Sequence, residues 1–430
     1  MDYVKLINCM RCGMCLPHCP TYKETFLETA SPRGRVALVR KFQEGELADS
    51  EKLLEHLSLC LDCQACASAC PCGVNAGELV AEFRCEKKQG EGLSMMEELI
   101  LRKLVPHPDR LERAIAPLRL YQRLGLQKAV RSLGLLKVFP AALGRMEGLL
   151  PALPAAALRR TLNEITPGQG PERGTVGFFL GCVMSLVFSE ASLATVQLLS
   201  ALGYKVITPK AQKCCGAPKM LGHDREGVLR AARFNTDLFG SYHLDFVVTD
   251  CGGCGAELKK YGHHLDGEDE ATAFSAKVRD ISEVLAAEGA RLQPMLKPLP
   301  LKVTYHDPCH LAHCQGIASE PRALINMIPC IDFRELEQAD ACCGSAGTYN
   351  IEKPEMSDRV LTRKVGNIAK SGADYLVTGN PGCLLQLKKA LADAAPKVKV
   401  IHLTELLQMS IDGLCGETLD KKAVALTRPM

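Results

Sequence analysis

Hydrophobic and polar residues follow two different periods along the second half of the chain. Short β-branched runs, such as FVVT at 246–249 and YLVT at 375–378, predict buried strands. Longer segments, such as SEASLATVQLLSALG at 189–203, carry apolar residues at helical spacing and end in glycine, which predicts helices. Strands that alternate with helices indicate parallel sheets flanked by helices.

This alternating part of the chain contains an internal repeat in which each copy reads strand, helix, CCG loop, helix, strand, cysteine loop, helix. The corresponding segments are TVGFFLGC (175–182) with LKVTYHDPC (301–309), KCCGAP (213–218) with ACCGSA (341–346), DFVVTDCGGC (245–254) with DYLVTGNPGC (374–383), and VRDISEVL (278–285) with VKVIHLTELL (398–407). We call the copies the first CCG domain, expected at 173–297, and the second CCG domain, expected at 298–430. Ligands of such sheets bind beyond the carboxyl ends of the strands.

Two regions precede the repeat. Residues 1–90 hold ten cysteines and residues 91–172 hold none. Prolines divide the second region into short helical pieces, and residues 101–160 contain 12 Lys or Arg against 3 Asp or Glu. We therefore expect a basic helical connector over 91–172. Packing between the cysteine domains, docking on an acidic partner subunit and peripheral contact with an anionic membrane are its three candidate roles.

The composition and the N-terminal residues limit the cellular compartments and the classes of partner that we expect for this chain. The 430 residues carry a net charge of +3, which lacks the basic excess of a nucleic-acid-binding protein, so we expect no nucleic-acid partner. The N-terminus has no apolar signal core, and no apolar run reaches the roughly 20 residues that span a bilayer. These features predict a cytoplasmic protein, with peripheral attachment to the inner face of the membrane left open. In the cytoplasm, 22 cysteines indicate metal binding rather than disulfides.

The N-terminal cysteines form two copies of one motif. CMRCGMCLPHCP at 9–20 and CLDCQACASACP at 60–71 both match C-x2-C-x2-C-x3-C-P, the run that binds 4Fe–4S cubanes in bacterial ferredoxins. The fourth cysteine of each run ligates the other cluster, and two complete runs make the zinc alternative weak. The motif therefore predicts a ferredoxin-like domain at 1–90 with two cubanes, one held by Cys9, Cys12, Cys15 and Cys70, the other by Cys60, Cys63, Cys66 and Cys19.

The cysteines of the two CCG domains form unequal sets. The first set has five members, Cys182, Cys214, Cys215, Cys251 and Cys254. Five thiolates exceed the needs of one zinc ion or one ordinary cubane, so a cluster with bridging thiolates or a pair of iron centres would suit them. In the second CCG domain Asn380 stands at the position of Cys251. Its four thiolates suffice for a cubane or for zinc, and they are Cys309, Cys342, Cys343 and Cys383.

Several residues near the predicted ligands have structural or functional interpretations. The glycine after each cysteine doublet permits a turn with positive φ, which lets both sulfurs reach one metal assembly. Ser31 and Pro32 are typical of a helix N-cap and first turn, and Arg33 and Arg35 either face an anionic cluster or lie in solvent. The histidines of HDPCHLAH, namely His306, His310 and His313, are candidates for metal ligation, hydrogen bonding to cluster sulfur, proton transfer or simple packing.

Together these motifs resemble the glycolate oxidase iron–sulfur subunit family, whose relatives include the iron–sulfur subunit of anaerobic glycerol-3-phosphate dehydrogenase and the heterodisulfide reductase subunits. The resemblance rests on the twin runs, SPRGR at 31–35, HDPC at 306–309, CCGSAGTY at 342–349 and GNPGC at 379–383. It implies an α+β chain: a mostly helical two-cluster ferredoxin domain followed by two repeated α/β CCG domains with parallel sheets. It also implies a non-cubane 4Fe–4S cluster on the five cysteines of the first CCG domain, and a further 4Fe–4S cluster, or zinc, in the second.

On this resemblance, the chain is an electron-transfer subunit of a flavin-dependent glycolate or D-lactate dehydrogenase complex. A FAD-binding subunit takes hydride from the hydroxyacid, and single electrons pass through the clusters to a quinone, an electron-transfer flavoprotein or another redox protein. No dinucleotide-binding fingerprint or P-loop is evident, so flavin binding by this chain is not indicated. A heterodisulfide-reductase-like catalytic subunit acting at the five-cysteine cluster, and a docking module with structural zinc, are the alternatives.

Overall fold

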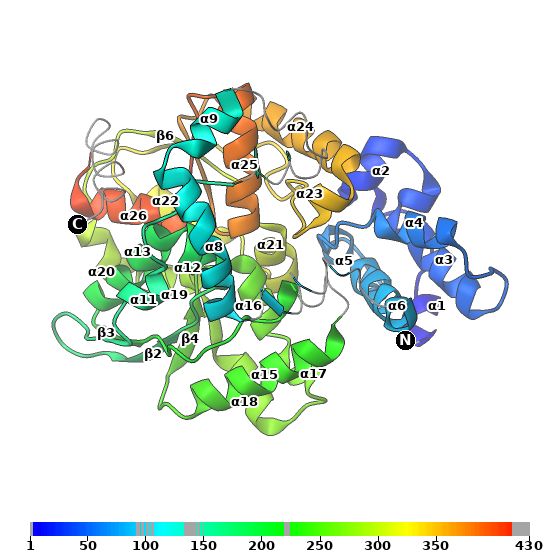
Figure 1. The fold of residues 1–430 in the computed structure, drawn as a ribbon, viewed down its shortest axis with the longest axis horizontal. Coiled ribbons are helices and arrows are strands. Elements are labelled where there is room, and N and C mark those ends of the chain that lie inside the picture. Colours follow the sequence, from blue (N-terminus) through cyan, green and yellow to red (C-terminus); the bar gives the residue numbers. More distant parts are fainter. Residues whose placement is uncertain are drawn as a thin grey trace.

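A helical lobe and a larger α/β body make up the computed structural model (Figure 1), which describes residues 3–91, 107–132, 150–218 and 224–414, together with residues 95, 99, 103, 104, 144, 147 and 148. In Figure 1 the helical lobe is blue and includes the N-terminal end, and the two sheets lie in the green to orange body. This order of a helical domain and then α/β repeats confirms the expected fold class.

The N-terminal lobe contains no strand within residues 3–91. Its hydrophobic core is formed by residues such as Leu6, Val39, Leu57 and Phe83, all of which are fully buried. The helices are α1 (Tyr3–Ile7), η1 (Leu16–His18), α2 (Pro20–Thr25), η2 (Glu28–Ala30), α3 (Pro32–Gln43), α4 (Glu51–Ser58), α5 (Ala65–Ser68) and α6 (Ala76–Glu91).

Helix α3 begins where the sequence predicts. Ser31 has extended backbone angles, and its Oγ accepts a hydrogen bond from the backbone N–H of Gly34 at 3.0 Å. Pro32 occupies the first helical position, where a missing N–H costs nothing. The cap fixes the start of α3 and, with it, the direction in which the arginines of the first turn point.

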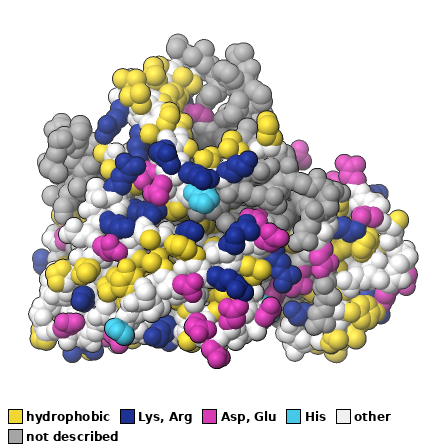
Figure 2. All heavy atoms as spheres, turned by 60° about the horizontal axis from the view of Figure 1, so that its bottom comes forward, with side chains coloured by type: hydrophobic (Ala, Val, Ile, Leu, Met, Phe, Trp, Pro, Cys, Tyr) yellow, Lys and Arg dark blue, Asp and Glu magenta, His cyan; other side chains and the backbone are white. Residues whose placement is uncertain are grey.

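The described residues of the connector form helices and one short strand. The helices include α8 (Pro108–Arg123), α9 (Leu126–Ser132) and α11 (Leu158–Thr161), and the strand is β1 (Ile165–Thr166). Large hydrophobic side chains remain exposed on α8 and nearby, among them Leu118, Leu120, Leu124 and Leu126. Figure 2 shows a face of the molecule on which Lys and Arg side chains lie close to exposed hydrophobic ones. The described residues contain no helix with the length and apolar character that crossing a membrane requires.

The first sheet has the strand order β1-β3-β2-β4-β5, and its last four strands run parallel. The strands are β1 (Ile165–Thr166), β2 (Gly174–Phe178), β3 (Tyr204–Ile207), β4 (Phe246–Thr249) and β5 (Val278–Asp280). The helices around them are α12 (Cys182–Val187), α13 (Ser189–Ala201), α15 (Arg225–Gly240), α16 (Gly252–Leu258), α17 (Tyr261–His264), α18 (Asp269–Lys277), α19 (Ile281–Ala287), α20 (Gly289–Leu292) and η5 (Gln293–Met295).

The second sheet has the order β7-β6-β8-β9 and is wholly parallel. This order repeats β3-β2-β4-β5, so the internal repeat of the sequence is a repeat of the fold. The strands are β6 (Lys302–Tyr305), β7 (Asp332–Phe333), β8 (Tyr375–Thr378) and β9 (Lys399–His402), and the helices are α21 (Cys309–Gln315), α22 (Ser319–Met327), α23 (Tyr349–Glu352), α24 (Pro354–Ser371), α25 (Pro381–Ala394) and α26 (Leu403–Asp412).

Two features of the sheets differ from the pattern predicted along the sequence. Strands β3 and β7 stand between the first helix and the CCG loop of each copy, where the sequence predicted no strand. Strand β7 has only two residues, too few for a periodic signal. Strand β1 pairs antiparallel with β3 and precedes residue 173, so the first sheet is not purely parallel.

The two CCG domains share one hydrophobic core. Apolar residues of both sheets, such as Val176, Phe178, Val303 and Val377, belong to a single buried cluster. Helix α13 packs on α26, α19 on α22 and α16 on α21. Because the elements that bear the predicted cysteine ligands lie at this interface, the two copies face each other with their ligand-binding edges.

The helical lobe contacts the second CCG domain. Helix α5 packs on α21, and α2 packs on α24. The hydroxyl of Tyr349 donates to the carbonyl oxygen of Leu59 at 3.0 Å, and the Arg363 Nε donates to the Glu24 carboxylate at 2.8 Å. In Figure 1, α5 lies at the junction between the blue lobe and the body. The second cysteine run is therefore the part of the lobe that is closest to the CCG cysteines.

Candidate iron–sulfur sites

Four cysteines from both N-terminal runs surround one cavity of the helical lobe. Cys60, Cys63 and Cys66 of the second run line it, and so does Cys19 of the first run. Cys60, Cys66 and Cys19 also interact electrostatically with one another. The structure thus brings together the four residues of the second predicted set, including the one that comes from the other run.

A buried arginine completes this cavity. Arg35 is 2% exposed, and its Nη1 points at Cys19 Sγ at 3.9 Å while its Nη2 donates to Thr21 Oγ1 at 2.9 Å. Its Nε finds no hydrogen-bond partner among the described residues. A buried cation with an unpaired N–H beside four thiols suits an anionic cluster, because the cluster would offset the cost of burying the charge. Arg33 instead pairs with Glu28 at 2.7 Å.

The first predicted set is closer to the surface. Cys12 is exposed, whereas Cys9, Cys15 and Cys70 are partly buried. Burial raises the pKa of Cys15, and the neighbouring Cys9 adds to this shift. Cys70 Sγ accepts a hydrogen bond from the backbone N–H of Val74 at 3.3 Å. Cys9 and Cys70 both pack against the core of the lobe.

The five cysteines of the first CCG domain form a chain of pairwise contacts beyond the carboxyl ends of β2, β3 and β4. Cys182 contacts Cys214, Cys215 contacts Cys254, and Cys254 contacts Cys251. Cys251 is the N-cap of α16, and its Sγ accepts from the backbone N–H of Cys254 at 3.4 Å. Four of the five are buried, and Cys182 is the more accessible one.

The chemistry of this set fits a multinuclear metal site. A hydrogen bond with Cys214, then burial, raises the pKa of Cys182 well above its usual range. Hydrogen bonds with Cys215 and Cys251, then burial, do the same to the pKa of Cys254. So many thiols in one buried place can ionise together only if cationic metal compensates their charge, and the thiolate is the form that binds metal.

The four cysteines of the second CCG domain also converge. Cys309 contacts Cys342, and Cys343 Sγ lies 3.5 Å from Cys383 Sγ. The backbone N–H of Gly344 donates to Cys342 Sγ at 3.4 Å. A hydrogen bond with Cys342, then burial, raises the pKa of Cys309 well above its usual range, as in the first CCG domain. This set therefore has the same metal-binding character with one thiol fewer.

Both cysteine doublets are followed by a glycine in the left-handed region. Gly216 has φ +106° and Gly344 has φ +86°. A Cβ on Gly344 would lie 2.7 Å from the backbone oxygen of Ser357. The turn expected after each doublet is thus present, and in the second CCG domain no other residue fits it without displacing α24.

Asn380 joins the two CCG sites. Its Nδ2 donates to Cys383 Sγ at 3.7 Å, and its Oδ1 accepts from the backbone N–H of Gly253 at 3.1 Å. The same Oδ1 lies 3.7 Å from Cys251 Sγ, which donates to it. The residue that replaces a ligand in the repeat therefore makes a hydrogen-bonded bridge between one cysteine of each set.

Cys63 joins the helical lobe to the second CCG site. It belongs to one buried cluster with Cys342 and Tyr349, and Cys309 packs against that cluster. Burial raises the pKa of Cys63 well above its usual range, and the nearby Cys342 and Cys309 add to the shift. The second N-terminal set and the second CCG set are consequently neighbours.

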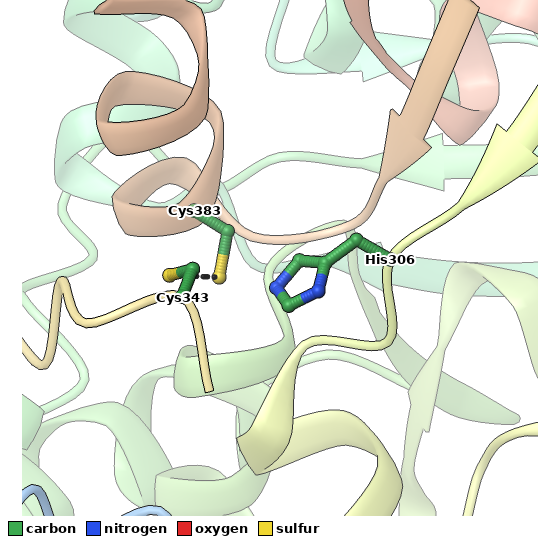
Figure 3. Close-up of side chains that lie close together, drawn as sticks. All are labelled: His306, Cys343 and Cys383. Carbon is green, nitrogen blue, oxygen red and sulfur yellow. Dashed lines mark hydrogen bonds between the residues drawn. The ribbon is translucent and has the colours of Figure 1, made fainter. Parts of the chain in front are cut away.

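The three histidines of HDPCHLAH occupy different places. His306 is fully buried beside Cys343 and Cys383 (Figure 3). A ring nitrogen of His310 hydrogen-bonds the Asp62 carbonyl oxygen at 2.9 Å, and one of His313 hydrogen-bonds Ser68 Oγ at 3.2 Å. His310 and His313 thus help dock the helical lobe, while His306 alone faces sulfur atoms.

Comparison with known proteins fits this arrangement region by region. The family model described as a 4Fe-4S dicluster domain matches residues 5–74, and the one described as a cysteine-rich domain matches 176–259 and 303–388. The model of the glycolate oxidase iron-sulfur subunit linker region matches residues 92–150. A probable glycolate oxidase iron-sulfur subunit of Bacillus subtilis is 40% identical over 418 residues, which cover 95% of this chain and 94% of that protein. The chain belongs to the glycolate oxidase iron–sulfur subunit family.

Two other relatives of this chain are not named as glycolate oxidase subunits. Lactate utilization protein A of Geobacillus kaustophilus is 31% identical over 240 residues, covering 54% of this chain and 98% of that protein. A fumarate reductase (CoM/CoB) subunit of Methanothermobacter marburgensis is 29% identical over 420 residues, covering 95% of this chain and 73% of that protein. The similarity to the second of these extends through both the N-terminal lobe and the repeat.

Three contributions to the sites of this family member could not be predicted from its sequence. Arg35 was one of two candidate arginines, and only burial distinguishes it from Arg33. Asn380 was identified only as a missing ligand, and its bridging role was not predicted. Lys364, fully buried on α24, donates to the carbonyl oxygens of Gln338 and Ala339 and interacts with Cys342 and Cys343. No cysteine or glycine motif marks this lysine.

Proposed function

We propose that this chain is the electron-transfer subunit of a flavin-dependent 2-hydroxyacid dehydrogenase complex that oxidises glycolate or D-lactate. In this complex, a FAD-binding subunit accepts hydride from the hydroxyacid, and this chain accepts single electrons and passes them to a quinone or to a redox protein such as an electron-transfer flavoprotein. The names of the Bacillus and Geobacillus relatives support the substrate class. Iron–sulfur clusters bound at the cysteine sets would supply the one-electron chemistry.

The observation that carries this proposal is the unbroken line of cysteine sets. Cys15 lies beside Cys19, Cys63 beside Cys342, and Asn380 connects Cys383 to Cys251. The order is therefore first N-terminal set, second N-terminal set, second CCG set, first CCG set. A binding or structural protein has no need for four metal sites in a continuous line, whereas electron transfer requires that neighbouring centres be close.

Electrons would enter at the outer end of this line. Cys12 is exposed, and Met10 and Met14 on either side of it are 74% and 58% exposed. Phe26 and Leu27 add further exposed apolar surface in the same lobe. Methionine and aromatic side chains are enriched at protein interfaces, so this end suits docking of the flavin subunit.

Electrons would leave at the first CCG set. Cys182 lines a cavity together with residues of α8 and α11, including Glu112 and Arg159. Among the residues that the structure describes, two buried donors there, Arg159 Nη1 and Gln212 Nε2, have no hydrogen-bond partner. Oxygen atoms of an acceptor suit these donors, and the cavity reaches the most accessible of the five cysteines.

The test is anaerobic purification of the full chain with and without its flavin subunit. We expect roughly twelve to sixteen irons per chain and no zinc, since each cluster holds four irons. Glycolate or D-lactate should reduce the iron–sulfur centres only when the flavin subunit is present. Oxidation of either hydroxyacid by the isolated chain with an artificial dye would overturn the proposal, and roughly eight irons with added zinc would support the docking module instead.

The site of entry has a separate test. The double change Met10→Glu and Met14→Glu should raise the Kd for the flavin subunit about tenfold or more, because buried apolar anchors dominate interface energies. Leu120→Glu on α8 is the control, since it tests whether the connector binds the partner instead. A larger loss with Leu120→Glu would place the partner on the connector.

The second candidate function is heterodisulfide reduction at the first CCG set. The complete five-cysteine set and the similarity to the methanogen's fumarate reductase (CoM/CoB) subunit favour it. A heterodisulfide would accept two electrons and two protons to give two thiols. Single turnover of a heterodisulfide by the pre-reduced chain alone would support this function over the relay.

A further inference from the structure

His306 faces the sulfurs of the second CCG site with a nitrogen that has no hydrogen-bond partner in the described part of the chain. It follows β6 directly and is 0% exposed. Its nearest ring nitrogen and the Sγ atoms of Cys343 and Cys383 all lie within 4.8 Å of one another. Figure 3 shows the edge of the imidazole turned toward these two sulfurs. With metal–nitrogen distances of about 2.0–2.1 Å and metal–sulfur distances of about 2.3 Å, one metal ion reaches all three with a small adjustment.

The other hydrogen bonds of His306 fix its tautomer. Nδ1 lies 3.2 Å from the carbonyl oxygen of Ala339, which can only accept, so Nδ1 carries the proton. Nε2 is buried and unpaired. Metal-bound histidines typically donate their second N–H to a carbonyl in this way, which orients the ring. Nε2 therefore presents a lone pair, rather than a proton, to the site.

A buried cation beside His306 supports the neutral imidazole. Lys364 Nζ donates to the same Ala339 oxygen at 3.2 Å and to the Gln338 oxygen at 2.5 Å. A second positive charge on the ring would meet this ammonium in a buried place. The neutral imidazole is therefore favoured over the imidazolium. The Nε2 of a neutral ring can bind metal through its lone pair, whereas an imidazolium could only donate an N–H to sulfur.

The two CCG domains have different residues at two corresponding positions near their cysteines. His306 corresponds to Phe179 in the first CCG domain, where the fifth donor is Cys251. In the second domain the position of Cys251 is Asn380, whose amide hydrogen-bonds the other domain. One copy thus has phenylalanine and cysteine, and the other has histidine and asparagine. Each site has five potential donors, but one of the five in the second is an imidazole.

We propose that Nε2 of His306 is a ligand of the metal centre in the second CCG domain, alongside the thiolates of Cys309, Cys342, Cys343 and Cys383. This inference rests on the proposed presence of an iron–sulfur centre there. A neutral imidazole in place of an anionic thiolate leaves the centre less negative, and histidine ligation raises the potentials of iron–sulfur clusters. The two CCG centres would then differ in reduction potential.

The experiment uses the full chain, purified anaerobically with iron and labelled with ¹⁵N-histidine. Pulsed EPR is recorded in each redox state in which a centre is paramagnetic. We expect a strong hyperfine coupling to imidazole nitrogen that changes with the isotope. His306→Phe, which copies the first CCG domain, should lose this coupling and lower the potential of one centre or release its iron. His243→Phe is the control and should keep both, because His243 is exposed and precedes β4, at the opposite end of that strand from Cys251.

The outcomes separate this inference from the proposed function. A full iron count without imidazole coupling, or coupling that survives in His306→Phe, overturns the ligand and leaves the relay intact. An iron count that is explained by the two N-terminal sets and the first CCG set alone would contradict the proposal that the second CCG domain holds an iron–sulfur centre. If His306→Phe does not fold, His306→Gln, which is closer in size and polarity, must show the same loss of coupling.

Discussion

Gly344 and Gly216 show how one residue type fixes the geometry of each CCG loop. Both have positive φ, and both follow a doublet whose two sulfurs must turn toward one assembly. At Gly344 the Cβ of any other residue would also strike the Ser357 carbonyl. The requirement for glycine is therefore both conformational and steric.

Gly344→Ala should lower the free energy of unfolding by about 1–3 kcal/mol, the usual cost of a strained backbone position, and reduce the iron content of the second CCG site. Thermal or urea denaturation together with iron analysis measures both effects. Gly366→Ala in α24 is the control, because no atom lies within 4 Å of the added methyl group. The control should stabilise the protein by about 0.5–1 kcal/mol, and a loss of iron from it would contradict our account.

At the scale of elements, the helix caps place side chains at the sites. Ser31 caps α3, which carries Arg35 into the cavity of the second N-terminal set. Ser50 caps α4 in the same manner, accepting from the Leu53 N–H at 3.2 Å, but no residue of α4 lines that cavity. The two caps therefore have the same local role, and of the two helices α3 alone carries a side chain into the cavity.

Ser31→Ala and Ser50→Ala should each lower the free energy of unfolding by about 0.5–2 kcal/mol, because each leaves a helix N–H unpaired. Only Ser31→Ala should shift a reduction potential, since it frees the turn that holds Arg35. Potentiometric titration followed by EPR measures this shift. Equal shifts in both variants would show that Arg35 is not positioned by the cap.

His402 caps α26 and links the CCG domains. Its Nδ1 accepts from Thr404, and its Nε2 hydrogen-bonds the Asp250 carbonyl oxygen at 2.9 Å. Burial lowers the pKa of His402 from 6.5 to about 4. Between pH 6.5 and about 4, His402 is therefore protonated in the unfolded chain but neutral in the folded chain. Because the unfolded state binds more protons, the free energy of unfolding decreases as the pH falls through this range.

His402→Asn keeps a capping side chain without the titration. Relative to wild type, its free energy of unfolding should improve by up to about 3 kcal/mol as the pH falls from about 6.5 to about 4, because each tenfold change in proton affinity corresponds to about 1.4 kcal/mol. Buried Asp250 and Asp280, with pKa values raised to about 7 and about 6, act in the opposite direction but equally in both proteins. Urea unfolding across this range measures the difference, and a pH-independent difference would rule out His402.

At the scale of the whole molecule, the four cysteine sets depend on contacts between domains. Tyr349, His310 and the α2–α24 contact hold the helical lobe on the second CCG domain. Asn380 and the shared hydrophobic core hold the two CCG domains together. The links from the lobe to the second CCG set, and from there to the first, therefore cross domain interfaces.

Asn380→Leu should lower the reduction potential of the centre at Cys383, because a hydrogen bond to sulfur stabilises the more negative reduced state. It should also slow electron transfer between the two CCG centres, because the bridge to Cys251 is lost. Redox titration and rapid-freeze EPR measure the two effects. Asn326→Leu on α22 is the control, since its amide donates to the Arg322 oxygen, away from the cysteines. Unchanged potential and rate would show that Asn380 is a purely structural contact.

Residue spacing and periodicity along the chain predict the order of domains, the repeat and the two N-terminal cysteine runs. These features are local: cysteine spacing, glycine after a doublet and the periods of about 2 and 3.6 residues depend only on neighbouring residues. The N-cap at Ser31 and the positive φ of Gly216 and Gly344 belong to the same class. Strand β7 was missed because two residues are too few for any period.

The packing of distant elements sets which cysteine sets are neighbours, and no local pattern of residues contains this information. Cys63 and Cys342 are 279 positions apart, and Asn380 reaches Cys251 across 129 positions. This packing also placed Arg35 in the cavity of the second N-terminal set and Arg33 between Glu28 and the first cysteine run, and it turned His306 rather than His310 toward sulfur. Burial and orientation result from how distant elements pack, and the same residue type with the same neighbours in sequence can adopt either arrangement.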